Sequence, residues 1–339
     1  MSKNFKNIFN KKKSKPYIIA EIGNNHNGSI LLAKKLIIEA KRSGADCVKF
    51  QTFSTDSLFS KKSFKNNKKL KNDSDKYTLK INDFKKLKIF AKKNKIDFTA
   101  TPFSKQEVDF LIYDLKLKFI KIASMDLNNY PLIEYIAKKK VSVIISTGFG
   151  SKNEIKRAIS ILKKNKVKYV ILHCVSEYPP KEEKLNLMRI KELVKLFKCP
   201  VGFSDHTIGT VASTTALVLG AKIIEKHFTL DKKMKGWDHS ISSNPIELKM
   251  ICDFSKVVKK ILGKSKITRV EKLKNSKIFR RSIVAANNLK KGKKILFNDL
   301  NFKRPGDGLD PIMWKKIIGK RLKNNIGYDK QILLRDIIK

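Results

Sequence analysis

The chain has 339 residues, of which 76 are Lys or Arg and 30 are Asp or Glu, so its formal net charge is +46. A hydrophobic content of 41% is enough for a sizeable core and excludes a wholly disordered protein. No apolar run approaches the roughly 20 residues of a transmembrane helix, and none behind the basic N-terminus is long enough for a secretory signal. We therefore expect a cytoplasmic protein that does not enter the membrane and has one large and one small domain.

A positive charge of this size is typical of nucleic-acid binders. The lysines, however, are spread along the whole chain, with dense patches only at 11–15 and 61–80. Lys also far outnumbers Arg, the residue that reads bases with a planar fork, and no helix-turn-helix, zinc-finger or RNA-binding signature occurs. We expect no specific nucleic-acid partner, although the positive field can attract an anionic substrate. The four cysteines form no CxxC pair, which predicts reduced thiols in a core.

Short apolar strands alternate with amphipathic helices about eight times along the first part of the chain. The predicted strands are Tyr17–Ile22, Asp46–Gln51, Asp97–Thr101, Phe119–Ser124, Val141–Ser146, Lys168–Cys174, Pro200–Ser204 and Lys222–Phe228. The predicted helices are Ile30–Arg42, Asn82–Lys93, Lys105–Asp114, Pro131–Lys139, Ser151–Lys164, Asn186–Leu196, Gly209–Leu219 and Pro245–Leu262. Eight such units over about 250 residues predict an α/β fold, the parallel (β/α)8 TIM barrel. A doubly wound open sheet is less favoured because the sequence at 23–28 is not GxGxxG.

The pattern changes after the last predicted helix, which divides the chain. We expect a basic N-terminal extension at 1–15, the barrel at 16–263, a lysine-rich linker at 264–279 and a small module at 280–339. The small module carries a weak internal repeat, in which six residues recur at the same spacing. The two sets are Leu289, Lys293, Ile295, Leu296, Asp299, Leu300 and Ile326, Lys330, Ile332, Leu333, Asp336, Ile337. The repeat predicts a compact, pseudo-symmetric and mostly β module.

Polar residues follow every predicted strand, at the carboxyl ends where TIM-barrel active sites form. They are Glu21, Lys49, Gln51, Thr101, Lys121, Ser124, Asp126, Ser146, His173, Ser204, Asp205, His206 and His227. Buried charges are costly unless they are paired or functional, so this pattern predicts a site. His206 and His227 follow adjacent strands, and two imidazoles suit a divalent metal such as Mn²⁺. Two hydrogen-bonded histidines without a metal are the alternative.

Several of these segments resemble signature motifs of the sialic-acid synthase family. The motifs are Ile-Ala-Glu-Ile-Gly-Asn-Asn-His-Asn-Gly-Ser (19–29), Val-Lys-Phe-Gln-Thr (48–52), Thr-Pro-Phe-Ser (101–104), Lys-Ile-Ala-Ser-Met-Asp-Leu-Asn-Asn-Tyr-Pro-Leu (121–132), Ser-Thr-Gly (146–148), Leu-His-Cys (172–174), Tyr-Pro (178–179) and Gly-Phe-Ser-Asp-His-Thr (202–207). The segment Lys-Arg-Pro-Gly-Asp-Gly (303–308) is similar to the family's SAF domain, an antifreeze-like β-clip module. The resemblance runs in order from about residue 16 to the end, and it implies a TIM barrel followed by a SAF domain.

The resemblance also implies roles for individual residues. His206 and His227 would bind Mn²⁺, with Mg²⁺ or Co²⁺ as alternatives, and Glu21 and Asp126 would be catalytic. Many bacterial members have Ser-Gly-Glu where this chain has Ser-Met-Asp at 124–126, which shortens the reach of the carboxylate. The residues expected to bind substrates are Lys49, Gln51, Thr101, Lys121, Ser124, Ser146, Tyr178, Ser204, Asp238 and Arg304. Arg304 would reach the sugar bound by a second subunit, which implies a domain-swapped homodimer.

The implied reaction condenses phosphoenolpyruvate with an open-chain N-acyl amino sugar such as N-acetylmannosamine and releases phosphate by C–O cleavage. Legionaminate or pseudaminate synthesis from a 6-deoxy diacetamido hexose is the alternative, and a phosphorylated hexosamine is less favoured. A nucleic-acid-binding protein on an inactive barrel is the alternative from another class. A shikimate-type aldol synthase is disfavoured by the C-terminal module.

Overall fold

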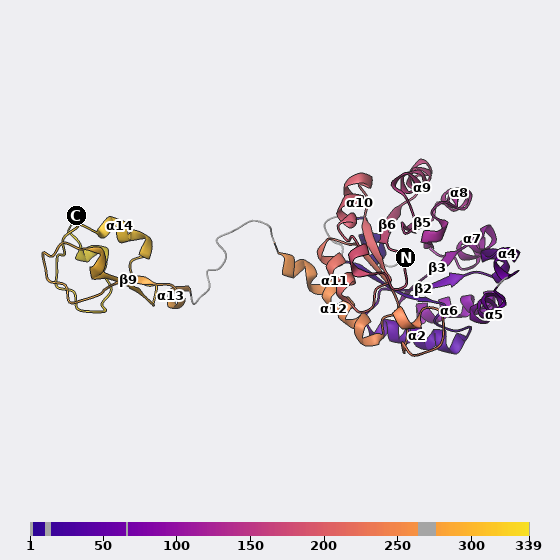
Figure 1. The fold of residues 1–339 in the computed structure, drawn as a ribbon, viewed down its shortest axis with the longest axis horizontal. Coiled ribbons are helices and arrows are strands. Elements are labelled where there is room, and N and C mark those ends of the chain that lie inside the picture. The colour runs from indigo at the N-terminus through magenta and orange to yellow at the C-terminus, as the bar shows by residue number, and fades with distance from the viewer. Residues whose placement is uncertain (1–2, 11–14, 66, 264–275, 339) are drawn as a thin grey trace. The chain divides into compact units, whose positions relative to one another are not determined.

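The computed structural model describes residues 3–10, 15–65, 67–263 and 276–338, which form two compact units, Met1–Gly263 and Lys264–Lys339 (Figure 1). Most of the predicted linker, 264–275, lies outside the described residues. Eight parallel strands form the sheet of the first unit, which confirms the predicted TIM-like barrel. They are β1 Tyr17–Gly23, β2 Cys47–Thr52, β3 Asp97–Pro102, β4 Phe119–Ile122, β5 Ser142–Ser146, β6 Tyr169–Cys174, β7 Val201–Asp205 and β8 Ile223–His227.

The sheet is almost closed on itself. The strands are hydrogen-bonded in the order β3-β2-β1-β8-β7-β6-β5-β4, so β3 and β4 form the two edges. The Thr99 hydroxyl donates a hydrogen bond of 2.8 Å to the carbonyl oxygen of Phe119 and joins these edges. The barrel therefore has one seam, and all eight strands end on the same side.

Helices surround the barrel because each follows a strand and buries an apolar stripe against the sheet. They are α2 Ile30–Arg42, α6 Ile81–Lys93, α7 Lys105–Asp109, α8 Tyr130–Lys138, α9 Lys152–Lys164, α10 Arg189–Phe197, α11 Val211–Val218 and α12 Pro245–Leu262. The helix predicted at 105–114 ends early, and its second half, Phe110–Asp114, is a π-helical turn. Among the described helices, none has the length and apolar character that a membrane crossing requires.

Between β2 and α6 the chain forms three short helices that were not predicted, and the second and third lie in the lysine-rich patch at 61–80. They are α3 Thr55–Leu58, α4 Lys61–Lys65 and α5 Lys68–Tyr77. Tyr77 packs edge-on against Trp237 with ring centroids 5.5 Å apart, and Trp237 also stacks on Phe53 at 6.4 Å. These aromatic contacts hold the segment beside the loop that follows β8.

The N-terminal segment is more than a basic extension, because it contributes to the core. Helix α1, Lys3–Asn7, places Phe5 and Ile8 in a buried apolar cluster at the N-terminal ends of the strands. The Phe5 ring stacks on Phe119 at 3.9 Å and meets Tyr17 edge-on at 5.4 Å. Phe9 packs against the same cluster. Basic composition hid this role, since few apolar side chains of the segment carry it.

The C-terminal unit contains α13 Ser276–Phe279, β9 Ser282–Ala285, β10 Leu300–Lys303 and α14 Trp314–Ile317, with β9 and β10 antiparallel. The internal repeat is confirmed as a structural one. The backbone N–H groups of Leu296 and Leu333 each donate a 2.9 Å hydrogen bond to the aspartate three residues later. A bridge between Leu289 and Ile326 pairs the two halves.

Candidate active site

A cavity of about 310 Å³ opens at the carboxyl ends of the barrel strands. Most of the residues predicted from sequence line it. They are Glu21, Lys49, Gln51, Thr101, Lys121, Ser124, Ser146, Tyr178, Ser204, His206, His227 and Asp238. They come from seven strands and the loops behind them, so their convergence is a consequence of barrel closure.

Strand register places three of these groups in one row. Glu21 on β1 is paired with Lys49 on β2 and with His227 on β8. Side chains alternate between the two faces of a strand, so Glu225, two residues before His227, faces the same interior. Lys226 faces the helices instead, where its ammonium group lies 3.1 Å from the Asp205 carboxylate and both side chains are fully buried.

Two ammonium groups and two carboxylates form a buried cluster at the base of the cavity. The Lys49 Nζ lies 2.9 Å from Glu21 Oε1 and 3.8 Å from Glu225 Oε2. The Lys121 Nζ lies 3.3 Å from Glu225 Oε1, which also accepts a 2.8 Å hydrogen bond from the Ser204 hydroxyl. Removing four charges from water is costly, and mutual pairing offsets that cost. With all four groups ionised, the cluster has no net charge.

The pKa values of these groups diverge. Burial raises the pKa of Glu21, and repulsion from Glu225 adds to the rise although Lys49 opposes it. Burial alone would lower the pKa of Lys49, but Glu21 and Glu225 outweigh burial and raise it. Burial lowers the pKa of Lys121. The pKa values of the two lysines therefore shift in opposite directions, and strongly perturbed pKa values are typical of catalytic sites.

Glu21 also keeps one oxygen free for other partners. Its Oε1 accepts a hydrogen bond of 3.2 Å from Gln51, whereas its buried Oε2 has no hydrogen-bond partner. Gln51 in turn accepts a 3.4 Å hydrogen bond from Asn24. An unpaired buried carboxylate oxygen costs free energy unless a ligand or water completes it. Glu21 is thus positioned to accept a proton from a bound molecule.

The two predicted metal ligands lie together at the cavity wall, with ring centroids 5.5 Å apart. His206 Nε2 lies 3.1 Å from the Tyr178 hydroxyl, and the two rings stack at 4.1 Å. His227 Nδ1 is buried without a hydrogen-bond partner, 3.6 Å from Asp238 Oδ2. In the described part of the chain, no group of three or more His, Cys, Asp or Glu side chains is assembled to hold a metal ion.

A tight arrangement around Gly148 positions a serine of the site. The Gly148 N–H donates a hydrogen bond of 3.1 Å to the Ser124 hydroxyl. A Cβ atom at Gly148 would lie 2.0 Å from Ser176 Oγ and 2.8 Å from Ser124 Oγ, so a side chain cannot be accommodated without movement. The glycine of the Ser-Thr-Gly motif is therefore required for close packing of these hydroxyls.

Three of the barrel residues singled out from sequence point away from the cavity. Asp126 does not line the cavity, because the chain turns in a 3-10 helix at 124–126; its Oδ1 accepts a 3.1 Å hydrogen bond from Asn129 instead. His173 Nε2 lies 2.7 Å from the carbonyl oxygen of Leu185, facing away from the barrel interior. Asp205 likewise faces outward, toward Lys226. Arg304 belongs to the C-terminal unit, where its guanidinium lies 5.5 Å from the Phe279 ring centroid.

Sequence reasoning missed Glu225, which bridges the two lysines of the cluster. A signal existed, since a glutamate inside an otherwise apolar strand and two residues before a site histidine must share that histidine's face. It also missed the apolar residues at the rim of the cavity, to which no motif assigned a role. The rim residues that line the cavity are Leu58, Phe59, Phe103, Met125, Phe149 and Trp237.

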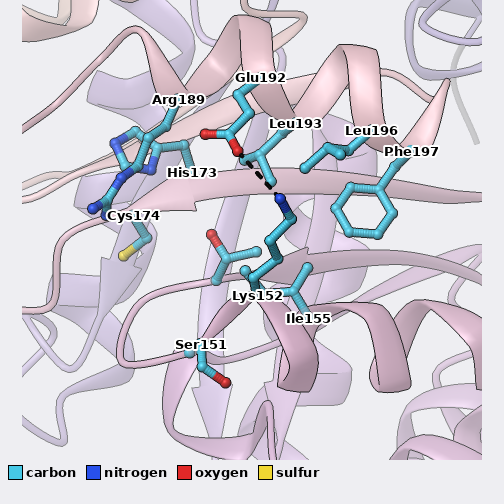
Figure 2. A pocket seen from close by; sticks show the side chains of 12 residues that line it. Ser151, Lys152, Ile155, His173, Cys174, Arg189, Glu192, Leu193, Leu196 and Phe197 are labelled. Carbon is cyan, nitrogen blue, oxygen red and sulfur yellow. Dashed lines mark ion pairs between the residues drawn. The ribbon is translucent and has the colours of Figure 1, made fainter.

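A second cavity, of about 330 Å³, lies between α9 and α10 and shares Cys174 with the first (Figure 2). Lys152 and Glu192 face each other across it, with 3.9 Å between Nζ and Oε1. Arg189 and His173 also line this cavity, and burial together with repulsion from Arg189 lowers the pKa of His173. In the described residues it contains none of the Glu21–Lys49–Glu225–Lys121 cluster, so the chemistry belongs to the first cavity.

Comparison with known proteins places this site in a family. The NeuB family matches residues 36–267 and the SAF domain matches 280–338. The chain is 41% identical over 332 residues to the N,N'-diacetyllegionaminic acid synthase of Campylobacter jejuni subsp. jejuni, covering 94% of this chain and 99% of that protein. It is 38% identical to the protein of the same name from Legionella pneumophila subsp. pneumophila, over 95% of this chain and 94% of that one.

A solved structure agrees with these matches. The crystal structure of N-acetylneuraminic acid (sialic acid) synthetase from Leptospira borgpetersenii is similar with a TM-score of 0.71 and 36% sequence identity. The match covers 77% of this chain and 89% of that one. The chain therefore belongs to the NeuB family of sialic-acid, legionaminic-acid and pseudaminic-acid synthases and carries a C-terminal SAF domain.

Proposed function

We propose that this enzyme condenses phosphoenolpyruvate with an open-chain, unphosphorylated N-acyl amino sugar and releases phosphate. The buried Lys49–Glu21–Lys121–Glu225 cluster at the base of the cavity carries the proposal. Two buried ammonium groups are suited to a substrate that bears both a phosphate and a carboxylate. The family relatives, named as synthases of nine-carbon sugar acids, support the same reaction.

Each group of cavity side chains has a proposed role in this reaction. Lys49 and Lys121 hold the phosphate and carboxylate, and the hydroxyls of Ser124, Ser146 and Ser204 donate hydrogen bonds to the same oxygens. Carbon 3 of phosphoenolpyruvate forms the new bond to the aldehyde carbon, and water adds at carbon 2.

Glu21 is the proposed acceptor of the proton from that water, because its raised pKa and its unpaired Oε2 suit a general base. The former aldehyde oxygen takes up a proton and becomes a hydroxyl group. Loss of phosphate from carbon 2 then cleaves the C–O bond and leaves a ketone.

A divalent cation is expected beside the two imidazoles. The cluster is neutral, so an added polyanionic substrate needs a compensating positive charge. His206 and His227 fit such an ion, since imidazole is a common metal ligand and His227 Nδ1 has no hydrogen-bond partner. Oxygen atoms of water or substrate, which Mn²⁺ prefers, would complete its coordination. His206 would exchange its contact with the Tyr178 hydroxyl for the ion. Bound there, the ion would act as a Lewis acid toward the aldehyde oxygen.

The cavity wall bears on which sugar is used. The cationic side chains that line it are Lys49 and Lys121, both engaged by carboxylates, and the two histidines. None of the described lining residues offers a further cation for a sugar phosphate. The largely exposed rim residues Met125 and Phe149 present apolar surface instead. Together with the two relatives named as legionaminic acid synthases, this surface favours a 6-deoxy diacetamido hexose over N-acetylmannosamine.

The test measures phosphate release from phosphoenolpyruvate with Mn²⁺ and a panel of sugars. The panel contains N-acetylmannosamine, its 6-phosphate and a 2,4-diacetamido-2,4,6-trideoxy hexose. We expect release with the unphosphorylated sugars and the highest kcat/KM with the trideoxy sugar. Absence of release with every sugar would overturn the reaction, and preference for the 6-phosphate would overturn only the acceptor.

The domain-swapped homodimer implied by the family stays a prediction. Its test mixes two inactive variants, Lys121→Ala and Arg304→Ala. If Arg304 acts in the partner's barrel, mixed dimers regain part of the turnover, because one of their two sites has both residues intact. No recovery after subunit exchange would contradict the swap.

A further inference from the structure

Five lysines surround a cavity of about 530 Å³ at the N-terminal ends of β3 and β4, the end of these strands opposite the candidate active site. We call this cavity the lysine groove. Its charged lining residues are Lys88, Lys92, Lys95, Lys116, Lys118 and Asp97. Helix α6 supplies the first two lysines, and the turns before β3 and β4 supply the others. The groove therefore lies at the seam where the barrel edges meet.

These ammonium groups differ from two other lysines of the same helix. Lys85 and Lys86 of α6 pair with aspartates at 3.2 and 3.8 Å. Within the described residues, no ion pair joins a groove lysine to a carboxylate. Asp97 can offset only one of the five positive charges, and its Oδ2 accepts a 2.5 Å hydrogen bond from the Tyr17 hydroxyl. The groove thus holds an excess of positive charge.

Burial and repulsion between these like charges both lower the pKa of one groove lysine, Lys88. Partial burial lowers the pKa of Lys88, and repulsion from Lys92, Lys116 and Lys118 lowers it further. Such repulsion weakens the folded state unless an anion occupies the space between the charges. The positive charge of the groove therefore favours binding of an anion.

Two of the groove lysines have an unusual backbone conformation. Lys95 and Lys116 have φ values of 54° and 48°, a left-handed conformation that glycine adopts most readily. The corresponding turns before β2 and β8 use Gly44 and Gly220, with φ values of 95° and 98°. Lys140, Lys166 and Lys198 adopt the same conformation before β5, β6 and β7, with φ values of 57°, 57° and 51°. The left-handed turn therefore holds lysines at this end of the barrel, and what distinguishes the groove is that five lysines line one cavity.

We propose that the lysine groove binds a small oligophosphate, a molecule with two or more linked phosphate groups. Lysine is a compact point charge that suits phosphate, whereas base reading and bidentate recognition favour arginine. A volume of about 530 Å³ falls within the range of small-molecule sites, and a concave site at one seam matches a compact ligand better than an extended strand. The proposal does not depend on the reaction proposed for the other end of the barrel.

The experiment titrates the full-length protein with inorganic tripolyphosphate by calorimetry, at an ionic strength of about 0.15 M to screen diffuse attraction. The groove variant carries Lys88→Gln, Lys92→Gln and Lys118→Gln. The control variant carries Lys138→Gln, Lys249→Gln and Lys256→Gln, three exposed lysines that pair with carboxylates. Both variants lose the same charge, so any difference between them reflects position.

We expect the wild type and the control variant to bind alike and the groove variant to bind at least about tenfold more weakly. We also expect the groove variant without ligand to melt at a higher temperature than the wild type in low salt, because repulsion is relieved. Lack of binding by the wild type, or equal weakening in both variants, would overturn the site. A single-stranded oligonucleotide that binds more tightly as its length grows would show that the occupant is nucleic acid instead.

Discussion

Burial decides how much a lysine–glutamate pair contributes, and two pairs in this chain allow a direct comparison. Lys121 and Glu225 lie 3.3 Å apart at the base of the site, with side chains 4% and 6% exposed. Lys138 and Glu134 lie at the same 3.3 Å on the surface of α8, with side chains 66% and 55% exposed. Coulomb's law gives about 5 kcal/mol for this separation at an effective dielectric constant of about 20, but only about 1.3 kcal/mol in water.

The matched substitutions are Glu225→Gln and Glu134→Gln. The amide at 225 can still accept the hydrogen bond from Ser204, but it leaves two buried ammonium groups facing one carboxylate. Breaking a buried pair on one side costs about 3–5 kcal/mol, whereas an exposed pair on a helix contributes about 0.3–0.5 kcal/mol. We therefore expect the free energy of unfolding to fall by about 3–5 kcal/mol for Glu225→Gln and by less than about 0.5 kcal/mol for Glu134→Gln.

Urea unfolding followed by tryptophan fluorescence measures the difference. The chain has two tryptophans, one in each unit, so a Trp314→Phe background leaves Trp237 as the reporter of the barrel. Equal losses for the two variants would refute the reasoning, because they would show that the low-dielectric environment of the cluster contributes nothing.

Three further predictions follow from particular contacts. Phe5→Ala should destabilise the barrel by about 3–5 kcal/mol in the same urea assay, because the buried Phe5 ring stacks on Phe119. Phe9→Ala, which removes a half-buried ring, should cost clearly less. Similar losses for the two variants would contradict a role of Phe5 in the barrel core. Gly148→Ala should raise KM for phosphoenolpyruvate at least tenfold in a steady-state assay, since its Cβ would lie 2.0 Å from Ser176 Oγ; an unchanged KM would contradict the packing argument. Burial lowers the pKa of His26 from 6.5 to about 3, so its contribution to stability is present above pH 6.5 and is lost as the pH falls toward 3. The wild type should lose about 1.6 kcal/mol more than His26→Gln between pH 6.5 and pH 5, and parallel pH profiles would contradict this.

The predicted elements agree closely with the observed ones where periodicity was strong. Helices α2 and α12 have the predicted bounds, because their apolar residues recur at helical spacing and a serine and an asparagine cap their N-termini. Agreement was poorer where composition was uniform. Helices α4 and α5 carry so many lysines that no apolar stripe was evident, and the position of α5 depends on contacts such as Tyr77 with Trp237.

The site shows the same division. The row of Glu21, Lys49 and His227 could be predicted because each ends an apolar strand. Asp126 could not be placed, because a local 3-10 turn, invisible to periodicity, sets its direction. The lysine groove could not be foreseen either, since it joins residues up to 30 positions apart that no dense run connects.

The sequence by itself determined the barrel, the SAF module and most of the polar groups at the strand ends, because strand and helix periodicity and local motifs are short-range properties of the chain. The tertiary structure decided which charges pair, which face the interior and which remain unneutralised. Those outcomes depend on the closure of eight strands and on burial, because a carboxylate such as Glu225 acquires its partners only when β8 is placed opposite β2 and β4.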